Sequence, residues 1–345
     1  MVRASLAALL LVSLPVVATA GVVLPPGFTR QVYVTGQGFD RAEQGMSGVP
    51  VATTLGFDAA GRLYLAKSGS RYGTGQGEEL LSRVYRIPPG GGRLTPATEG
   101  RYLHGPPLRN PEVGTVGPRG EVFLTTYDPE REIGVVYRMR DGHPVLFAGG
   151  TPPAGSAPVL KQPEGVAVDA AGHVYVADRG RDRVVKLDPA GKLLAPHYLG
   201  LTVPRARMLA LDPVGALWIA GDGGAAAPWQ DGAGQIWRVA PDGSARLVFD
   251  GPHAASIAAG PGGALWVADR HAAKLFVLTA DGRRIEFAGF DDGDLPRSLA
   301  VAPVTPETRQ AGIAGDLFVV TFALRTWYMN EVLRISGPFE DLLRR

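Results

Sequence analysis

The sequence predicts an all-β protein, a six-bladed β-propeller of four-stranded antiparallel blades whose ring is closed by the N-terminal strand. Three observations carry this prediction. A short strand motif recurs six times, a glycine precedes every copy at one spacing, and turn-forming residues are spread evenly along the 345 residues. The chain contains 47 glycines and 29 prolines with no collagen-like period, which is typical of many short strands joined by tight turns.

The repeated motif is the second strand of each blade, an aromatic residue between two aliphatic ones. Its steps of 59, 52, 43, 48 and 52 residues fall in the range of propeller blades with loops of variable length. The copies are Leu63-Tyr64-Leu65, Val122-Phe123-Leu124, Val174-Tyr175-Val176, Leu217-Trp218-Ile219, Leu265-Trp266-Val267 and Leu317-Phe318-Val319, preceded by Gly61, Gly120, Gly172, Gly215, Gly263 and Gly315.

The aromatic residue of the motif is expected in the core, between neighbouring blades. A four-stranded sheet cannot bury its apolar side alone, so the blades must stack around a ring. The ring also needs a closing strand. The apolar segment Phe28–Val34 precedes the first repeat, and we expect it to pair as the outer strand of the last blade, beside residues 332–335.

The first twenty residues have the pattern of a secretory signal peptide. Arg3 is followed by an apolar stretch from Leu6 to Ala18, and Ala18-Thr19-Ala20 fits a small-x-small cleavage site. The stretch is shorter than the roughly 20 apolar residues of a membrane span. We therefore expect a signal peptide over residues 1–20, a single propeller domain over residues 21–345, and a periplasmic or secreted location.

Composition excludes several classes of partner and site. The chain has no cysteine, which excludes a disulfide framework, a thiolate zinc site and covalently attached c-type haem. The net charge of +2 gives no reason to expect nucleic acid or an anionic membrane as a partner. We expect a monomer that binds a small-molecule ligand, without a membrane span.

The alternation of strands sorts the loops between two faces of the propeller. Turns between strands one and two are mostly short, with residues 303–315 as the exception, whereas most long insertions fall on the other face, where a scaffold usually carries its binding groups. The residue that begins each innermost strand should point toward the mouth of the central channel on that face. Aligned by the repeat, this position holds Thr53, Glu112, Glu164, Arg207, Ala255 and Arg297.

Three interpretations of this column remain open. Glu112 and Glu164 could ligate a hard cation such as Ca²⁺, or act as an acid–base pair. Arg207 and Arg297 could clamp a carboxylate or phosphate. The same residues could instead form a ring of salt bridges that closes the channel without any ligand.

Four further residues are candidates for ligand binding at this mouth. Asp178 and Asp269 end second strands at equivalent repeat positions, and His253 and His271 flank one blade on the same face. Histidine is a common general base and metal ligand. The two aspartates could equally cap their own loops.

The stretch from Pro163 to Leu187 resembles an NHL repeat, and the chain as a whole resembles NHL and SMP-30/gluconolactonase-like six-bladed propellers. The segment from Leu24 to Val34 resembles the start of soluble quinoprotein (sorbosone dehydrogenase-like) sugar dehydrogenases. The first resemblance implies a fold that hosts many unrelated activities. The second implies pyrroloquinoline quinone (PQQ) as the cofactor of a sugar dehydrogenase.

The lactonase branch of the SMP-30-like family binds a divalent ion through Glu, Asn and Asp at the starts of inner strands. Here those positions offer Glu112 and Glu164, no Asn, and arginines elsewhere. The sequence therefore favours a propeller that binds a small polar ligand, sugar-like or carboxylate-bearing. A PQQ-dependent sugar dehydrogenase or a metal-dependent lactonase is the alternative.

The signal-peptide pattern predicts the start of the mature chain. Expressed in an export-competent bacterium, the protein should be recovered with Gly21 at its N-terminus, because cleavage follows the small residue Ala20. N-terminal sequencing together with intact-mass measurement checks this. Recovery of an uncleaved chain that begins at Met1 would contradict it.

Overall fold

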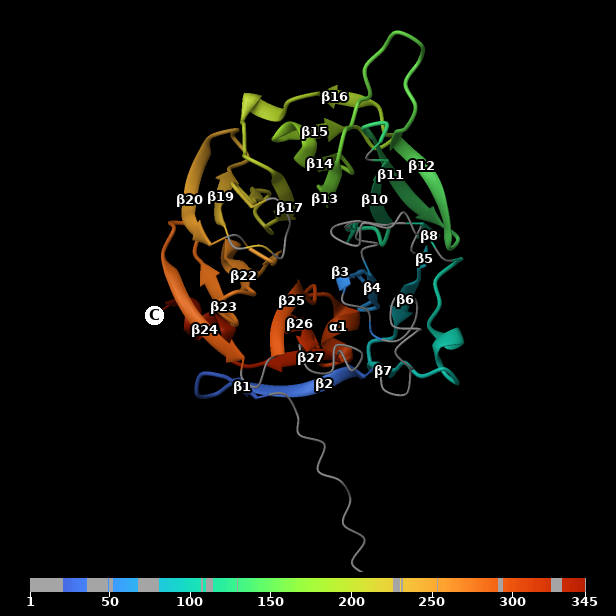
Figure 1. Cartoon of the computed structure of the whole chain (residues 1–345). Helices are drawn as coiled ribbons and strands as arrows, with labels where there is room; N and C mark the ends of the chain where they lie inside the picture. The colour runs from blue at the N-terminus through green and yellow to red at the C-terminus, as the bar shows by residue number, and fades with distance from the viewer. Residues whose placement is uncertain are drawn as a thin grey trace, which may run out of the picture.

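The computed structural model describes residues 21–35, 49, 52–67, 81–106, 108–109, 114–128, 130–225, 230, 232–252, 254–290, 294–323 and 331–344. Figure 1 shows them as a ring of six blades around a central axis. Each blade is an antiparallel sheet whose first strand lies innermost. The six-bladed architecture predicted from the repeat is confirmed.

Blades 2, 3 and 4 each contain four strands in sequence order. Blade 2 comprises β9 (Gly114–Val116), β10 (Val122–Asp128), β11 (Ile133–Arg140) and β12 (His143–Gly149); blade 3 comprises β13 (Pro163–Val168), β14 (Val174–Asp178), β15 (Arg183–Leu187) and β16 (Leu193–Ala195); blade 4 comprises β17 (Ala206–Leu211), β18 (Leu217–Gly221), β19 (Ala233–Val239) and β20 (Ala245–Pro252).

Blades 1, 5 and 6 add small variations to this plan. In blade 1 a single bridge from Leu103 to Tyr85 occupies the fourth position, and the short strands β5 (Leu81–Ser82) and β8 (Leu108–Arg109) pair with each other. The strands of blade 1 are β3 (Ala52–Phe57), β4 (Leu63–Lys67) and β6 (Val84–Ile87); those of blade 5 are β21 (Ser256–Ala259), β22 (Leu265–Asp269), β23 (Lys274–Leu278) and β24 (Arg284–Phe290); those of blade 6 are β25 (Asp294–Val301), β26 (Leu317–Ala323) and β27 (Glu331–Ser336).

The N-terminal segment closes the ring. Strand β2 (Thr29–Thr35) pairs antiparallel with β27 and is the fourth strand of blade 6, so in Figure 1 the blue start of the chain lies beside its red end. The predicted closing strand is therefore confirmed. Strand β1 (Val22–Val23) adds to the outer edge of β24 in blade 5, and β7 (Gly92–Arg93) runs parallel to β2.

Blades 1 to 5 turn tightly between their first and second strands, and the repeated glycine before each second strand adopts a left-handed conformation. In blade 3, Gly172 has φ of +88° and donates its N–H to the Asp169 carbonyl oxygen at 2.9 Å. A side chain is rarely tolerated at such a φ. The glycines at the other five repeat positions also have positive φ: Gly61, Gly120, Gly215, Gly263 and Gly315.

The central aromatic of each second strand is buried. Trp218, Trp266 and Phe318 are 0%, 1% and 0% exposed, which confirms their expected place in the core. Phe318 packs edge-on against Tyr33 of β2 and Phe57 of β3, with ring centroids 4.8 and 4.6 Å apart. This contact joins the last blade, its closing strand and the first blade.

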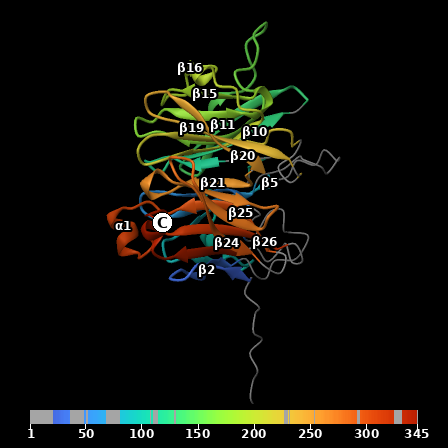
Figure 2. The same ribbon diagram turned by 90° about the vertical axis from the view of Figure 1, so that its left-hand side faces the viewer.

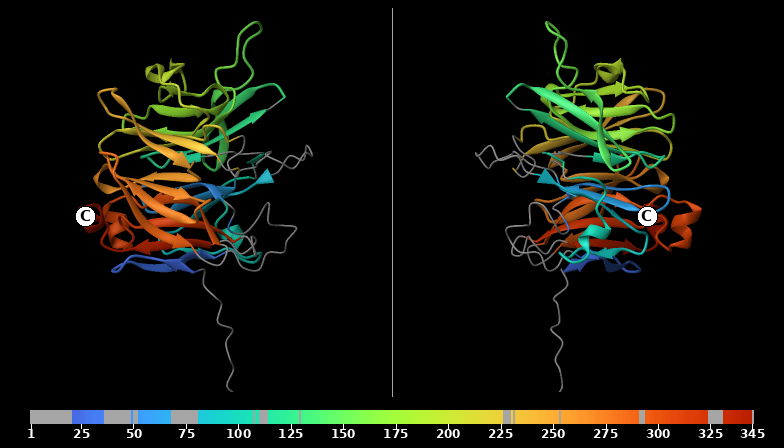
Figure 3. Two further views of the ribbon diagram at one scale, coloured as in Figure 1. Left: turned by 60° about the vertical axis from the view of Figure 1, so that its left-hand side comes forward. Right: turned by 90° about the vertical axis from the view of Figure 1, so that its right-hand side faces the viewer.

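The two faces of the disc differ in what they carry. Figures 2 and 3 show the disc edge-on, with α1 (Pro306–Gln310) and α2 (Phe339–Arg344) on one face. This is the face of the short turns, since the hydroxyl of Thr305 at the N-cap of α1 donates to the carbonyl of Ala59 in a first turn. The described residues also form four 3₁₀ turns: η1 (Glu99–Arg101), η2 (Arg179–Arg181), η3 (Tyr198–Gly200) and η4 (Pro261–Gly263). Among the described residues, no helix is long and apolar enough to cross a membrane.

Because Phe318 packs where the ring closes, we expect its removal to lower the free energy of unfolding strongly. Phe318→Ala should lower the free energy of unfolding by about 3–5 kcal/mol, because the cavity lies where three elements meet. Leu146→Ala, at a position that is 58% exposed on an outer strand, should change it by less than about 0.5 kcal/mol. Urea unfolding of both variants checks this; equal effects would contradict it.

Candidate functional site

Four of the residues that the repeat alignment places at the start of the innermost strands lie at β-bulges. In β17, Arg207 is the extra residue between the pairs Ala206–Gly221 and Met208–Ala220. Arg297 in β25 and Thr53 in β3 occupy the same kind of irregularity. In blade 3 the register shifts between Pro163 and Val166, so Glu164 lies in the bulge. Bulges re-aim side chains and are frequent beside binding sites.

These positions lie at the end of the strands away from the short turns. A cavity of about 200 Å³ lies on the ring axis and is lined by residues from all six innermost strands. The bulges lie at one end of this axial cavity. We call the described charged residues at this end the mouth cluster: Glu164, Arg179, Arg207, Asp222, Arg270 and Arg297.

Arg207 is bound by protein groups on two blades. Its side chain is 2% exposed, and its Nε donates to Asp222 Oδ1 at 2.7 Å. Its Nη1 donates to the carbonyl oxygen of Ala255 at 3.4 Å, and its Nη2 to that of Ala254. Both carbonyls belong to the segment leading into blade 5. Arg207 therefore fastens blade 4 to blade 5.

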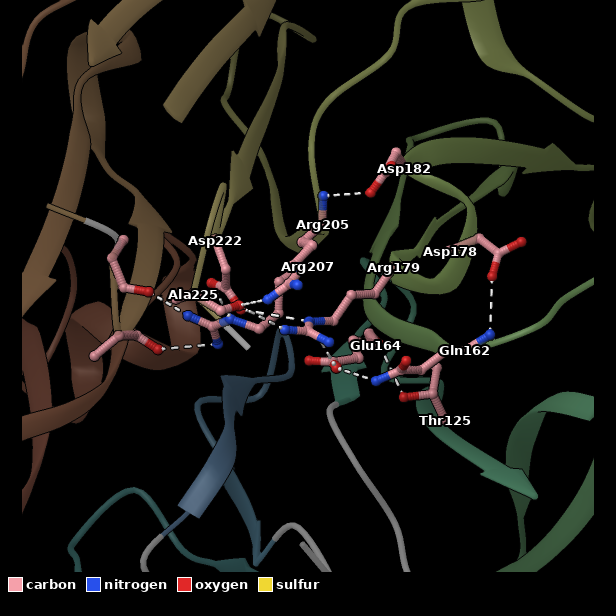
Figure 4. Close-up of polar contacts among 12 residues, drawn as sticks. Thr125, Gln162, Glu164, Asp178, Arg179, Asp182, Arg205, Arg207, Asp222 and Ala225 are labelled. Carbon is pink, nitrogen blue, oxygen red and sulfur yellow. Dashed lines mark hydrogen bonds and ion pairs between the residues drawn. The ribbon is translucent and has the colours of Figure 1, made fainter. Parts of the chain in front are cut away.

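Glu164 belongs to the same chain of contacts. It is 2% exposed, its Oε1 accepts a hydrogen bond from Gln162 Nε2 at 3.1 Å, and the same oxygen lies 3.5 Å from Arg179 Nε. Arg179 Nε also lies 3.5 Å from Asp222 Oδ2. Figure 4 shows the resulting series, in which Glu164, Arg179, Asp222 and Arg207 link blade 3 to blade 4.

Sequence reasoning missed Arg179, Asp222 and Arg270, although one signal could have found them. The three residues share one repeat position, directly after the second strands of blades 3, 4 and 5. The candidates Asp178 and Asp269 occupy the preceding position. The side chains that belong to the mouth cluster therefore come from the residue directly after each second strand, one position later than the candidates chosen from the sequence.

Asp178 and Asp269 hold their own loops. Asp178 is 0% exposed, and its Oδ1 accepts the backbone N–H groups of Lys161 and Gln162 at 3.0 and 2.9 Å. Its Oδ2 pairs with Arg181 and Arg183 at 3.3 and 3.2 Å. Asp269 Oδ1 accepts the N–H of Ala272 at 2.9 Å.

The other sequence candidates are placed only in part. His271 is exposed beside the Asp269 loop. The backbone of Thr53 lies in β3, whereas its side chain falls outside the described part. Glu112 and His253 lie outside the described residues. Among those that are described, no group of three or more His, Asp or Glu side chains could hold a metal ion.

Arg297 differs from Arg179 and Arg207, the two arginines of the cluster that contact its carboxylates. Its side chain keeps part of its surface accessible, but its Nη1 is fully enclosed and has no hydrogen-bond partner in the described part of the chain. Burial and the like charges of Arg207 and Arg270 lower its pKa to about 9, and Glu164 and Asp222 oppose this only in part. Because this pKa is still above 7, Arg297 remains a cation at neutral pH.

Within the described residues, the carboxylates of the mouth cluster contact Arg179 and Arg207, and Arg297 Nη1 has no partner. The described cluster contains four guanidinium groups and two carboxylates. A buried cation without a paired anion is costly. A bound anion would supply the missing partner, and a guanidinium presents a planar fork of donors that matches a carboxylate.

The opposite end of the channel is chemically different. A depression of about 720 Å³ is lined there by turn residues from several blades, including Pro118, Pro213 and Pro261. The two carboxylates in its lining bind their own turns: Asp169 contacts His173 at 2.9 Å, and Asp212 Oδ1 accepts the N–H of Ala216 at 2.8 Å. Asp212 also contacts Arg238 of β19 at 3.2 Å. Of the two ends of the channel, as far as the described residues show, the mouth cluster is the one where charged side chains from several blades meet.

Comparison with known proteins agrees with the fold and adds one family match. An NHL repeat is recognised at residues 160–187, which covers blade 3 from before β13 to the end of β15. No curated protein matches the sequence.

Solved structures that resemble this chain include enzymes of several kinds. PQQ-bound aldose sugar dehydrogenase from Streptomyces coelicolor superposes with a TM-score of 0.56 at 14% identity, covering 91% of this chain and 100% of that one. A glucose dehydrogenase gives 0.54 at 14% identity, covering 90% and 100%. A streptogramin B lyase gives 0.52 at 13% identity, covering 90% and 98%. At such identities the likeness is one of fold. The chain is a six-bladed β-propeller that carries an NHL repeat in its third blade.

Proposed function

We propose that this protein is an exported propeller that binds a small carboxylate-bearing ligand at the mouth cluster. The observation that carries the proposal is Arg297, a cation at the channel mouth whose Nη1 is buried without a hydrogen-bond partner among the described residues. The signal-peptide pattern of residues 1–20 supports the exported location. A near-axial site surrounded by a rigid ring suits a small ligand, because its walls are preformed.

The burial and ion pairing of Glu164 and Asp222 favour binding without turnover over catalysis. Glu164 and Asp222 are 2% and 1% exposed and lie against arginines. A general base must reach the proton that it removes from a substrate. Buried carboxylates held by guanidinium groups are poorly placed for that task. They are equally poor ligands for a metal ion, because Arg179 already supplies a positive charge beside both.

A PQQ-dependent sugar dehydrogenase is the second candidate. PQQ carries three carboxylates, and the guanidinium group of Arg297 suits such an anion. The fold is shared with a PQQ-bound aldose sugar dehydrogenase, although that likeness by itself supports the scaffold alone. If PQQ binds, it would supply the redox chemistry, and Arg297 would be one of the residues that hold it.

Thermal melting of the mature protein tests the binding proposal. Gluconate, citrate and PQQ are added separately at constant ionic strength, with uncharged glucose as the comparison. A ligand present at 100 times its dissociation constant stabilises the native state by about 2.7 kcal/mol. We expect at least one carboxylate to raise the melting temperature by several degrees and glucose to leave it unchanged. A shift with PQQ alone would favour the dehydrogenase.

Two variants tie such a shift to the mouth cluster. Arg297→Met should abolish it, whereas Arg309→Met, which removes an exposed arginine from α1 on the opposite face, should preserve it. If no carboxylate stabilises the wild-type protein, or if Arg297→Met keeps the full shift, the proposed function is wrong.

The same substitution predicts an opposite effect on the ligand-free protein. Arg297→Met should raise the free energy of unfolding by about 1–3 kcal/mol at pH 7, because it removes a buried cation that lies among other cations. A ligand-binding residue that reduces stability is typical of functional sites. Urea unfolding without added anion measures it; a variant less stable than the wild-type protein would show that Arg297 is structural.

A further inference from the structure

Two carboxylates form ion pairs with arginines of the mouth cluster. Asp222 contacts Arg207 at 2.7 Å and Arg179 at 3.5 Å, and Glu164 contacts Arg179 at 3.5 Å. The arrangement neutralises two of the four guanidinium groups. Arg297 in blade 6 contacts neither carboxylate, and its Nη1 has no hydrogen-bond partner among the described residues.

These carboxylates also act on Arg297 from a distance. Neither forms an ion pair with it, yet both stabilise its positive charge, while Arg207 and Arg270 destabilise it. Charges that attract a cation at this position must repel an anion bound there. Because Glu164 and Asp222 are 2% and 1% exposed, water and salt screen this repulsion only weakly.

The size of the repulsion depends on the charge of the ligand. Each additional negative charge on a bound anion meets the same two buried carboxylates, so multiply charged ligands lose more affinity than singly charged ones. A protein that discriminates between ligands in this way uses a repulsive element as well as an attractive one. Arg297 supplies the attraction, and the two carboxylates supply the repulsion.

We propose that Glu164 and Asp222 are specificity-determining residues of the mouth cluster, which hold Arg179 and Arg207 in place and limit the affinity of the site for multiply charged anions. This inference rests on the proposed function, since it requires that an anion binds at Arg297. It assigns to the two carboxylates a role other than metal ligation or proton transfer.

Calorimetric titration with acetate and with citrate tests the inference. Both anions are titrated at one ionic strength into the wild-type protein, Glu164→Gln and Asp222→Asn. Each variant removes one buried negative charge and keeps the side-chain shape. We expect roughly threefold tighter binding of acetate and tenfold or more for citrate, so that the ratio of the two dissociation constants changes. Near-UV circular dichroism identifies which variants retain the native fold, and either variant suffices.

Asp212→Asn is the matched control. Asp212 is also a buried aspartate of blade 4 and is paired with an arginine, Arg238, at 3.2 Å, but it lies in the short turn at the opposite end of the blade. Its loss should lower the melting temperature and leave both dissociation constants within twofold of the wild-type values. A purely structural role for Glu164 and Asp222 would make all three variants behave alike.

The outcomes separate the two proposals. If the wild-type protein binds the anions and the variants keep the wild-type ratio, or bind both anions more weakly, the specificity role is wrong and the proposed function stands. If the wild-type protein binds neither anion and is not stabilised by the other carboxylates, the proposed function fails and the specificity role fails with it.

Discussion

The pairing of β2 with β27 is the interaction on which the rest of the structure depends. It joins residues 29–35 to residues 331–336, and it turns a row of blades into a ring with an axis. Packing completes the closure, because Phe318 contacts both Tyr33 and Phe57 across the seam. Strand β1 extends the same segment onto blade 5. Without a closed ring the six innermost strands would not converge, and neither the axial cavity nor its charged mouth would exist.

The innermost strands converge on the ring axis and bring buried charged side chains together. Only some of these charges have a partner of opposite sign among the described residues of the mouth cluster. Charged side chains from several blades meet where little water reaches them, and an unpaired charge there is destabilising. Arg207 finds Asp222 within its own blade and carbonyl oxygens in the next. Arg179 lies between Glu164 and Asp222. Arg297 Nη1 has no such partner in the described part of the chain. The ligand-free ring thus carries a local instability that an anion can relieve, which is the physical basis of the proposed function.

The resemblance to sugar dehydrogenases and streptogramin lyases concerns the scaffold. Propellers place chemically different groups at the same axial position, and activity follows from those groups rather than from the blades. In this chain the axial groups are arginines and internally paired carboxylates, a combination suited to holding and discriminating anions. The depression at the other end of the axis is lined by prolines and by aspartates that hold their own turns, so the two ends of one channel have opposite chemical character.

The sequence by itself determined the fold and most of the column that begins the innermost strands. The motif around Tyr175 or Trp266 repeats because every blade buries the same side chain, and Gly172 repeats because every first turn needs a positive φ. Those requirements are local, so they are visible in one chain. Only the tertiary structure decided the roles within the site. Whether Arg207 or Arg297 is neutralised depends on carbonyl oxygens and carboxylates of neighbouring blades, and these contacts leave no pattern within a repeat. Asp178 is still paired as the last residue of β14 and binds the N–H groups of Lys161 and Gln162, whereas Arg179 and Asp222 directly follow their second strands and reach the mouth cluster.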